Sequence, residues 1–345
     1  MSRILTAGFL LVALAAPIGA QAAETTGAGS TFAAPVVETW SAAYTKATGN
    51  TLRYQAVGSS IGVNLIKKAA VDFGTTDRPV PPAELKRLGL LQFPLVMGGV
   101  VPVVNLAGVP PGAIRFTGPL LAEIFLGKIR SWDHAAIREI NPGLNLPTAP
   151  ITVVHRLDGS GTTFNWSNYL SKVSPDWKRS VGEGNMIDWP LGLGGKGNDG
   201  VASLVGLVPG AIGYLEYSYA VQKLDRISFG TVQNSAGEFV SPSVQSFQAA
   251  AASADWKPSE DFYTLLTNAP GADAYPIAAT TFAVLYKQPR SPQATAAAMD
   301  FLRWALENGR PQAEALNYVP LPPSLVQQIT TYWDDNLGAT MARSK

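Results

Sequence analysis

Glycine and hydroxyl-bearing residues occur together in three short turns, and each turn stands directly before a segment with helical periodicity. The turns read GAGSTF (27–32), GSS (58–60) and DGSGT (158–162). The first turn of a helix has backbone N–H groups without an intrahelical partner, and the helix dipole adds partial positive charge there. Glycine lets a ligand approach the backbone closely, while serine and threonine add hydroxyl donors. The turns therefore have the composition of anion-binding sites.

One arginine stands beside these turns. Arg156 closes a predicted strand, two residues before Asp158 and four before Ser160. A guanidinium at this position could grip two oxygens of a tetrahedral oxyanion, with Asp158 holding it in orientation. Taken singly, each turn is explained more simply by helix capping, and the Arg156–Asp158 pair by an ordinary surface ion pair. The combination of all these features favours an oxyanion site.

Asp77 would place a carboxylate in the same site. It follows the stretch FGTT (73–76) and precedes Arg78 and Pro79, so a plain turn residue is the alternative interpretation. An ionised carboxylate can only accept hydrogen bonds, so it would bind the P–OH group of protonated phosphate and repel fully ionised sulfate. A buried mismatch of this kind discriminates between ligands by about 10⁴ or more. Asp77 is therefore the predicted selectivity residue.

The composition argues against several classes of function. The formal net charge is +1, so no overall basic field favours nucleic acid. The sequence has no cysteine, which excludes disulfides, thiolate metal sites and a lipid-anchored cysteine. The only histidines, His134 and His155, leave little scope for a metal cluster or a histidine-based triad. We therefore predict no metal, no cofactor and no enzymatic activity.

The segment GLGGKGNDG (192–200) looks like a phosphate loop. Its lysine is followed by Gly197, however, where a nucleotide-binding P-loop requires serine or threonine. We expect a glycine turn capped by Asp199.

The N-terminus has the pattern of a secretory signal peptide. Arg3 precedes an apolar run (4–18), and the small-residue pattern ends at Ala22. We predict a signal peptide over residues 1–22 with cleavage after Ala22, giving a soluble exported protein. The apolar run is too short to remain as a membrane-spanning helix.

The mature chain alternates segments of helical and strand periodicity, which is typical of an α/β protein. Residues 32–48 form a predicted helix with Val36, Trp40 and Tyr44 on its apolar face. A strand is expected over 51–57, followed by a helix with Ile61, Leu65 and Ala69 on its buried face.

Further strands are predicted at 99–106, 151–154, 211–217 and 277–286, with a long amphipathic helix at 292–308. The run 99–106 is apolar on both faces, which predicts a strand in a covered parallel sheet. The chain has 345 residues, which favours two domains. We expect a discontinuous first lobe (23–98 with 282–345) and a second lobe (99–281), joined by crossing strands at 100–105 and 279–286.

Over the whole mature chain, the sequence closely resembles the periplasmic phosphate-binding proteins of bacterial high-affinity phosphate ABC transporters. The matching stretches include GAGSTF, YQAVGSS, VDFGTTD, QFPLVMGGVVPVVN, DGSGTTF and PGAIGYLEY. The resemblance implies a two-lobed, class II periplasmic binding fold, each lobe a mixed sheet flanked by helices. It also implies that the lobes close on one dehydrated phosphate ion, which is then delivered to the permease subunits of the transporter.

The resemblance places the phosphate contacts on residues that the turns had already indicated. The implied contacts are Thr31, Phe32, Ser59, Asp77, Arg156, Ser160, Gly161 and Thr162. Thr31, Ser59, Ser160 and Thr162 would donate through backbone and hydroxyl, and Phe32 and Gly161 through backbone N–H alone. Arg156 would donate its guanidinium, ordered by Asp158, and Asp77 would accept the ligand proton.

Three alternatives remain at this stage: an enzyme acting on phosphate esters, a binding protein for another oxyanion such as sulfate, and a purely structural secreted protein. Arsenate has the charge, proton and shape of phosphate and is expected to compete for the site. The protein is expected to be a monomer.

Overall fold

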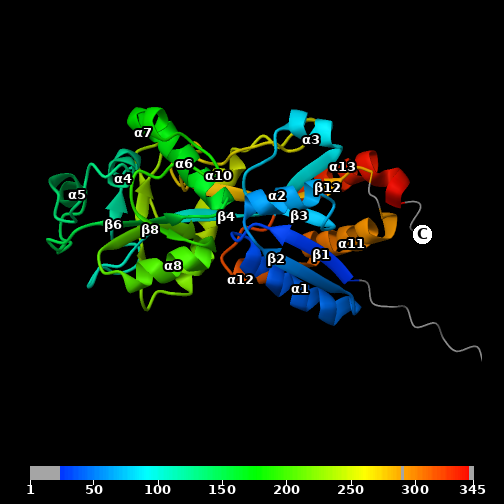
Figure 1. The fold of residues 1–345 in the computed structure, drawn as a ribbon, viewed down its shortest axis with the longest axis horizontal. Helices are drawn as coiled ribbons and strands as arrows, with labels where there is room; N and C mark the ends of the chain where they lie inside the picture. Colours follow the sequence, from blue (N-terminus) through cyan, green and yellow to red (C-terminus); the bar gives the residue numbers. More distant parts are fainter. Residues whose placement is uncertain (1–23, 289–290, 342–345) are drawn as a thin grey trace, which may run out of the picture.

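The computed structural model describes residues 24–288 and 291–341. The expected signal peptide (1–22) and its cleavage site lie outside the described residues. Two lobes follow one another along the long axis, each with helices around strands of a mixed sheet (Figure 1). The expected α/β class with two lobes is confirmed. None of the described helices is long and apolar enough to cross a membrane.

The first lobe combines the start of the described chain with its end. Its strands are β1 (Glu24–Gly29), β2 (Thr51–Ala56), β3 (Phe73–Thr76), the beginning of β4 (Leu90–Val104) and β12 (Ala278–Tyr286). Its helices are α1 (Ala34–Thr48), α2 (Ser59–Lys67), α3 (Pro82–Leu88), α11 (Pro292–Asn308), α12 (Arg310–Ala315) and α13 (Pro323–Met341). Strands β1, β2 and β3 run parallel, and β12 lies antiparallel to β3.

The second lobe is built from the middle of the chain. Its strands are β5 (Arg115–Phe116), β6 (Thr152–Arg156), β7 (Leu193–Gly195), β8 (Ala211–Glu216), β9 (Ser228–Phe229), β10 (Thr231–Gln233) and β11 (Phe239–Val240). Its helices are α4 (Gly118–Phe125), α5 (Ala135–Ile140), α6 (Gly161–Val173), α7 (Pro175–Ser180), α8 (Gly197–Leu207), α9 (Tyr217–Val221) and α10 (Val244–Ala252). The 3₁₀ helix η1 (Pro258–Glu260) follows α10 but packs against α13 of the first lobe. Strands β8, β6 and β7 run parallel, whereas β5, β10 and β11 form a separate small sheet.

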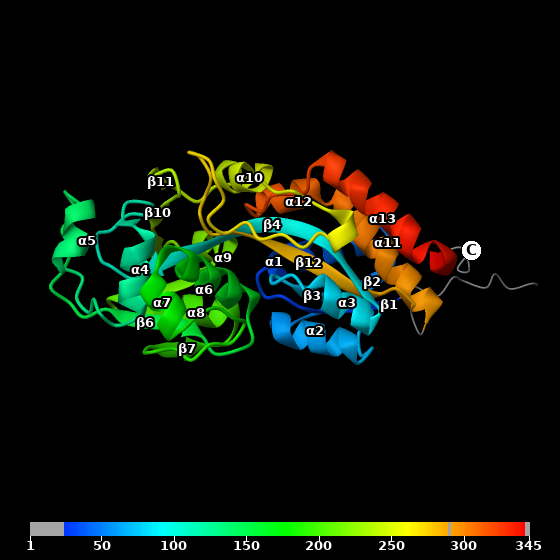
Figure 2. The ribbon, with the colours of Figure 1, turned by 90° about the horizontal axis from the view of Figure 1, so that it is seen from above.

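Strand β4 is shared by both lobes. Its residues up to Gly99 pair with β12, which lies beside it in Figure 2, and those from Val100 onward pair with β8. The prediction of a parallel sheet around 99–106 was wrong, because both of these neighbours are antiparallel. Every residue of β4 is nevertheless buried, and helices α6, α8, α9 and α10 pack against it. The continuous apolar run therefore reflects burial of both faces rather than strand direction.

Strand β12 carries the chain back beside β4 and lies between β4 and β3. Its register on β4 shifts between Thr281 and Phe282, the signature of a β-bulge. On its other side Phe282 pairs with Thr76, the last residue of β3. Because the two strands are antiparallel, Thr281 comes opposite the next residue, Asp77. A residue of the returning strand thus lies beside the predicted selectivity carboxylate.

The predicted helix over 32–48 is confirmed as α1. Its buried positions include Val36, Trp40 and Tyr44, as the periodicity indicated, and Gly49 ends the helix with a left-handed backbone. The expected helix at 292–308 is α11 with the same bounds. Phe301 of α11 packs edge-on against Tyr44, with ring centroids 5.4 Å apart.

The buried face of α2 differs from the prediction. Ile61 is 44% exposed, whereas Ser59, Gly62 and Ile66 are buried. Gly62 makes this packing possible, since a Cβ there would lie 2.4 Å from Cα of Gly29. The apolar periodicity of the sequence missed this face because its closest contact is made by a residue without a side chain.

Substitution Gly62→Ala tests this packing. The added methyl would force α2 away from β1 and β3, and overpacking of this kind costs about 1–3 kcal/mol. We expect urea denaturation to show a free energy of unfolding lower by that amount. Ile61→Ala, in the same helix but on the exposed face, should stay within about 0.5 kcal/mol of the parent protein. Equal stability of the two variants would contradict the packing described.

Candidate anion-binding site

The turn after β1 presents its amides to one side because its carbonyls are tied on the other. Tyr54 donates to Ser30 O (2.7 Å), Tyr219 donates to Thr31 O (2.8 Å) and Tyr318 donates to Phe32 O (2.6 Å). These three tyrosines come from β2, α9 and the segment after α12. The tethers span both lobes and fix the backbone of the turn.

The turn at the start of α2 is held close to the second lobe. Gly58 adopts φ 93°, a conformation that favours glycine, and its N–H donates to Gly29 O (2.8 Å). Ser60 N donates across the cleft to Gly159 O (3.0 Å). Ser59 lies between them and is 1% exposed. A buried serine therefore stands at the N-terminus of α2 and faces the loop before α6.

The third turn joins β6 to α6. The Ser160 hydroxyl accepts from Thr163 N (3.0 Å) and so caps α6. Helix capping was the simpler interpretation of this turn. Ser160 N donates to Asn185 O (2.8 Å), which leaves only the hydroxyl proton of Ser160 available to a ligand. The N–H of Gly161 donates to the Ser59 hydroxyl (3.1 Å), so the two lobes meet at this turn.

Several backbone donors in these turns have no hydrogen-bond partner among the described residues. Within the described residues, no acceptor lies in hydrogen-bond range of the N–H groups of Thr31, Phe32, Ser59 and Thr162. All four residues are buried. Buried backbone N–H groups are almost always hydrogen-bonded in folded proteins. These four are therefore suited to a ligand that carries several acceptor atoms.

Asp77 lies in the middle of this arrangement and is 2% exposed. Its Oδ1 accepts from the hydroxyls of Ser30 (2.5 Å) and Thr281 (2.7 Å). Its Oδ2 accepts from the Ser59 hydroxyl at the longer distance of 3.2 Å. Burial raises the pKa of the Asp77 carboxyl, while these hydroxyls and the charge of Arg156 act in the opposite direction.

Arg156 is the cation of the site and is 3% exposed. Its Nε donates to Asp158 Oδ1 (2.7 Å), and one terminal nitrogen forms an ion pair with Asp158 Oδ2. The other terminal nitrogen donates to the Thr162 hydroxyl (3.3 Å). Burial opposes ionisation of Asp158, but its contacts with Arg156 lower its pKa below the ordinary value. Since a guanidinium has five N–H groups, two remain for a ligand.

Asn198 joins the first turn to the third, and the sequence analysis missed it. Its amide donates to the hydroxyls of Thr31 (2.9 Å) and Thr162 (3.3 Å) and is completely buried. The expected cap by Asp199 was wrong: α8 begins without a side-chain cap, and Asp199 forms a surface ion pair with Lys223. The resemblance of residues 192–200 to a phosphate loop could have indicated that Asn198 lies at the anion site.

The structure brings all the predicted site residues together, with Asp158 behind Arg156 as expected. It adds Ser30, Thr281, Asn165 and Asn198. Ser30 lies inside the first predicted turn, but its hydroxyl serves Asp77 rather than a ligand. The sequence around Thr281 contains no motif that indicates a site, because only the pairing of β12 with β3 brings this residue next to Asp77. His155, the residue before Arg156, stacks on Trp189 with ring centroids 4.7 Å apart.

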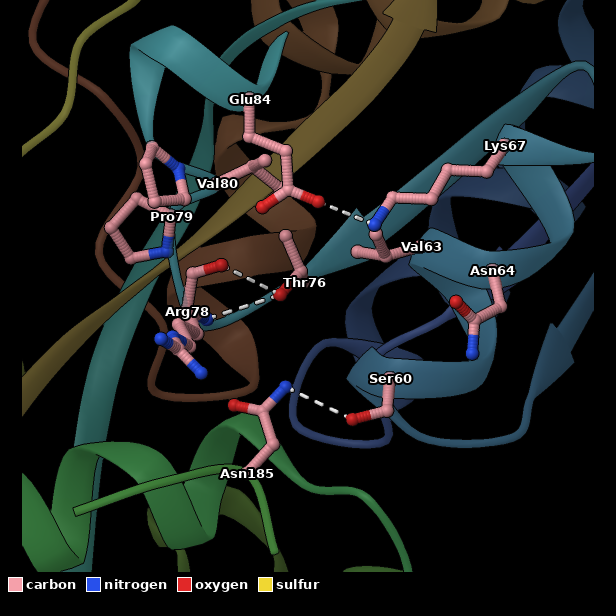
Figure 3. A pocket seen from close by; sticks show the side chains of 11 residues that line it. Ser60, Val63, Asn64, Lys67, Thr76, Arg78, Pro79, Val80, Glu84 and Asn185 are labelled. Carbon is pink, nitrogen blue, oxygen red and sulfur yellow. Dashed lines mark hydrogen bonds and ion pairs between the residues drawn. The ribbon is translucent and has the colours of Figure 1, made fainter. Parts of the chain in front are cut away.

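A cavity of about 250 Å³ opens beside the site, between α2 and the segment after β3 on one side and Asn185 on the other (Figure 3). Asn185 donates to the Ser60 hydroxyl (3.1 Å). Arg78 lies over the Phe164 ring, 4.9 Å from its centroid, and Asn165 donates to Asp77 O (2.7 Å). These contacts all join the first lobe to the second, so the cleft is closed in this structure.

Glu216, at the end of β8, is a second buried carboxyl close to the cleft. Its Oε2 accepts from Ser218 N (2.9 Å) and the Ser218 hydroxyl and lies 2.9 Å from the Tyr318 hydroxyl, whereas Oε1 has no partner among the described residues. Burial raises its pKa to about 8, and the charge of Asp77 adds to this rise. Among the described residues, no group of three or more histidine, cysteine or acidic side chains could hold a metal ion.

Comparisons with known proteins agree on one family. A family model described as PBP superfamily domain matches residues 15–308. The phosphate-binding protein PstS of Xylella fastidiosa (strain Temecula1) is 54% identical over 307 residues, covering 89% of this chain and 84% of the relative. The phosphate-binding protein PstS of Pasteurella multocida is 46% identical over 313 residues, covering 91% and 90%.

Solved structures show the same fold. A phosphate-binding protein from Stenotrophomonas maltophilia superposes with a TM-score of 0.67 at 18% sequence identity, covering 90% of this chain and 94% of that one.

The pH dependence of stability tests the environment of Glu216. Between about pH 4.5 and 8 the folded protein holds this proton and the unfolded chain does not, so the free energy of unfolding falls as pH rises. Glu216→Gln keeps the site neutral at every pH. We expect the melting temperature of this variant to fall less between pH 5 and pH 8 than that of the parent protein. At pH 8 the variant should melt at least about 2 °C above the parent.

The exposed Glu238→Gln, in the same lobe, serves as the control and should keep the parental pH dependence. A Glu216→Gln variant whose melting temperature follows the control at every pH would show that Glu216 ionises as readily in the folded protein as in the unfolded chain.

Proposed function

We propose, because this chain belongs to the PstS family of phosphate-binding proteins, that it captures inorganic phosphate between its lobes and delivers it to the permease subunits of an ABC-type phosphate importer. The observation that carries the proposal is a buried carboxylate, Asp77, among turns in which four buried N–H groups have no acceptor among the described residues. Such a pocket fits an anion that retains a proton.

The oxygens of phosphate would be bound by donors from both lobes. Thr31 and Phe32 of the first turn and Ser59 of the second offer backbone N–H groups from the first lobe. Thr162 offers its N–H from the second lobe, and the hydroxyls of Thr31, Ser160 and Thr162 add further donors. The N–H of Gly161 would turn to the ligand from the Ser59 hydroxyl that it now contacts.

Arg156 would bind two phosphate oxygens. Asp158 occupies its Nε and one terminal N–H, which holds the guanidinium plane in a fixed direction. The remaining N–H groups lie on the two terminal nitrogens. A fixed fork of this kind gives directional recognition that a lysine would not.

Asp77 would select for phosphate. Its Oδ2 has only one, long hydrogen bond within the protein and lies against Ser59 and Gly161, both proposed phosphate contacts. An ionised Asp77 can accept the remaining proton of phosphate, whereas sulfate offers none and would face an unpaired charge. Arsenate, which carries the same proton, would compete.

Capture would need no chemical step. The Ser59 hydroxyl donates to Asp77, and neither histidine contacts a hydroxyl of the site, so no activated nucleophile is evident among the described residues. We therefore propose a non-catalytic protein that binds as a monomer in the periplasm after cleavage at Ala22. The lobes that close on phosphate are proposed to be 23–98 with 282–345, and 99–281.

Calorimetric titration with phosphate and sulfate tests the function. We expect phosphate to bind at least about 100-fold more tightly than sulfate, because a site built for one hydrogen-bonding group rejects ligands that lack it. In Asp77→Asn an amide of the same shape replaces the acceptor, and the preference should fall at least about 100-fold. Comparable affinities of the parent protein for both anions would refute the proposal.

Asp199→Asn is the matched control, since it removes one carboxylate charge near the turn that carries Asn198 but lies 72% exposed on the surface. It should leave the preference unchanged. A loss of preference in this variant equal to that of Asp77→Asn would assign the effect to overall charge.

A further inference from the structure

Thr281 lies outside every turn that the sequence indicated, yet it contacts the centre of the site. It is fully buried on β12, and its hydroxyl donates to Asp77 Oδ1 at 2.7 Å. The antiparallel register of β12 with β3 brings it opposite Asp77, and the bulge in the pairing of β12 with β4 lies next to it. Ser30 donates to the same oxygen at 2.5 Å.

These hydroxyls favour the ionised form of the buried Asp77 carboxyl. A carboxylate without solvent tends to take up a proton, and burial is the largest influence on Asp77. A protonated Asp77 would be a donor, so it could no longer accept a proton from the ligand and would tolerate sulfate. Donors to the ionised form counteract this tendency, and the hydroxyls of Ser30 and Thr281 both act in this direction.

The two carboxylate oxygens of Asp77 differ in their hydrogen bonds. Oδ1 accepts two short hydrogen bonds, which occupy its lone pairs. Oδ2 has only the 3.2 Å bond from Ser59, and it lies close enough to Gly161 that a Cβ there would be 2.7 Å away. Oδ2 is therefore the oxygen on the side of the proposed phosphate contacts.

We propose that Thr281 is a specificity-determining residue: together with Ser30 it holds Asp77 as an ionised acceptor and leaves Oδ2 for the proton of the ligand. This inference rests on the proposed function and adds the group that maintains its selectivity. Thr281 acts through Asp77, so it is a positioning residue rather than a ligand contact.

The other charged groups around Asp77 do not replace the hydroxyls in keeping it ionised. Arg156, from β6, favours the ionised form of Asp77, but it is already paired with Asp158. The charge of Asp77 also contributes to the raised pKa of Glu216, from β8, and of Tyr54, from β2. The turn after β1, α2, β12 and α6 contribute uncharged contacts through Ser30, Ser59, Thr281 and Asn165.

The neighbouring residue offers a matched control. Thr280 is also buried on β12, at 3% exposure, but its hydroxyl has no hydrogen-bond partner. Successive side chains of a strand point to opposite faces, so Thr280→Val makes the same chemical change on the same strand away from Asp77. Thr281→Ser keeps the hydroxyl and should rescue the function.

The experiment compares Thr281→Val, Thr281→Ser and Thr280→Val with the parent protein. Calorimetry measures phosphate and sulfate affinity from pH 6 to pH 9, and carbon-13 NMR follows the Asp77 carboxyl in the ligand-free proteins. We expect Thr281→Val to bind phosphate about ten- to hundredfold more weakly at pH 7.5, the range for one hydrogen bond to a charged group. Its Asp77 should titrate at higher pH, and its preference for phosphate over sulfate should fall.

Thr281→Ser and Thr280→Val should match the parent in each measurement. The inference fails if Thr281→Val shows the same Asp77 titration and the same anion preference as Thr280→Val. If Thr281→Val does not fold, Thr281→Ala takes its place, with the same expectations. Absence of phosphate binding by the parent protein would instead refute the proposed function, so the two failures are distinguishable.

Discussion

A carboxylate buried among hydrogen-bond donors is the constraint around which this cleft is arranged. Burial of Asp77 favours its neutral form, whereas recognition of a protonated anion requires its charge. The protein meets this requirement with hydroxyls on Oδ1 and with Arg156 nearby, rather than with a direct ion pair. An arginine bound directly to Asp77 would have satisfied the acceptor and removed its use. Arg156 is instead paired with Asp158, so cation and acceptor stay separate.

The fold supplies the groups that this arrangement needs from distant parts of the chain. Asp77 follows β3, Thr281 lies on the returning strand β12, and Arg156 ends β6 in the second lobe. Tyrosine hydroxyls hold the carbonyls of the first turn, and the N–H groups of Thr31 and Phe32 in it have no acceptor among the described residues. Strand β4 and strand β12 connect the lobes, and β12 also carries the residue that supports Asp77. The proposed closure and the proposed selectivity therefore depend on one structural element.

Local patterns in the sequence were sufficient for the helices α1 and α11, for most of the longer strands and for the turns that the structure brings together. Glycine and hydroxyl residues before helices marked the turns, and the period of α1 and α11 gave their bounds. Features that depend on pairing across the sheet could not be read in this way. The antiparallel neighbours of β4, the buried Gly62 face of α2 and the contact of Thr281 with Asp77 all arise from tertiary register. Asn198 was missed because its turn was interpreted as a cap, although its composition already suggested anion binding.

The position of one proton tests the central claim most directly. Neutron diffraction from a crystal of the phosphate complex would show which oxygen carries the hydrogen between the ion and Asp77. The account predicts an ion between Arg156 and Asp77, with the hydrogen on a phosphate oxygen, Asp77 Oδ2 accepting it and the Thr281 hydroxyl pointing at Oδ1. A hydrogen located on Asp77 itself, donated to a fully ionised ligand, would contradict it.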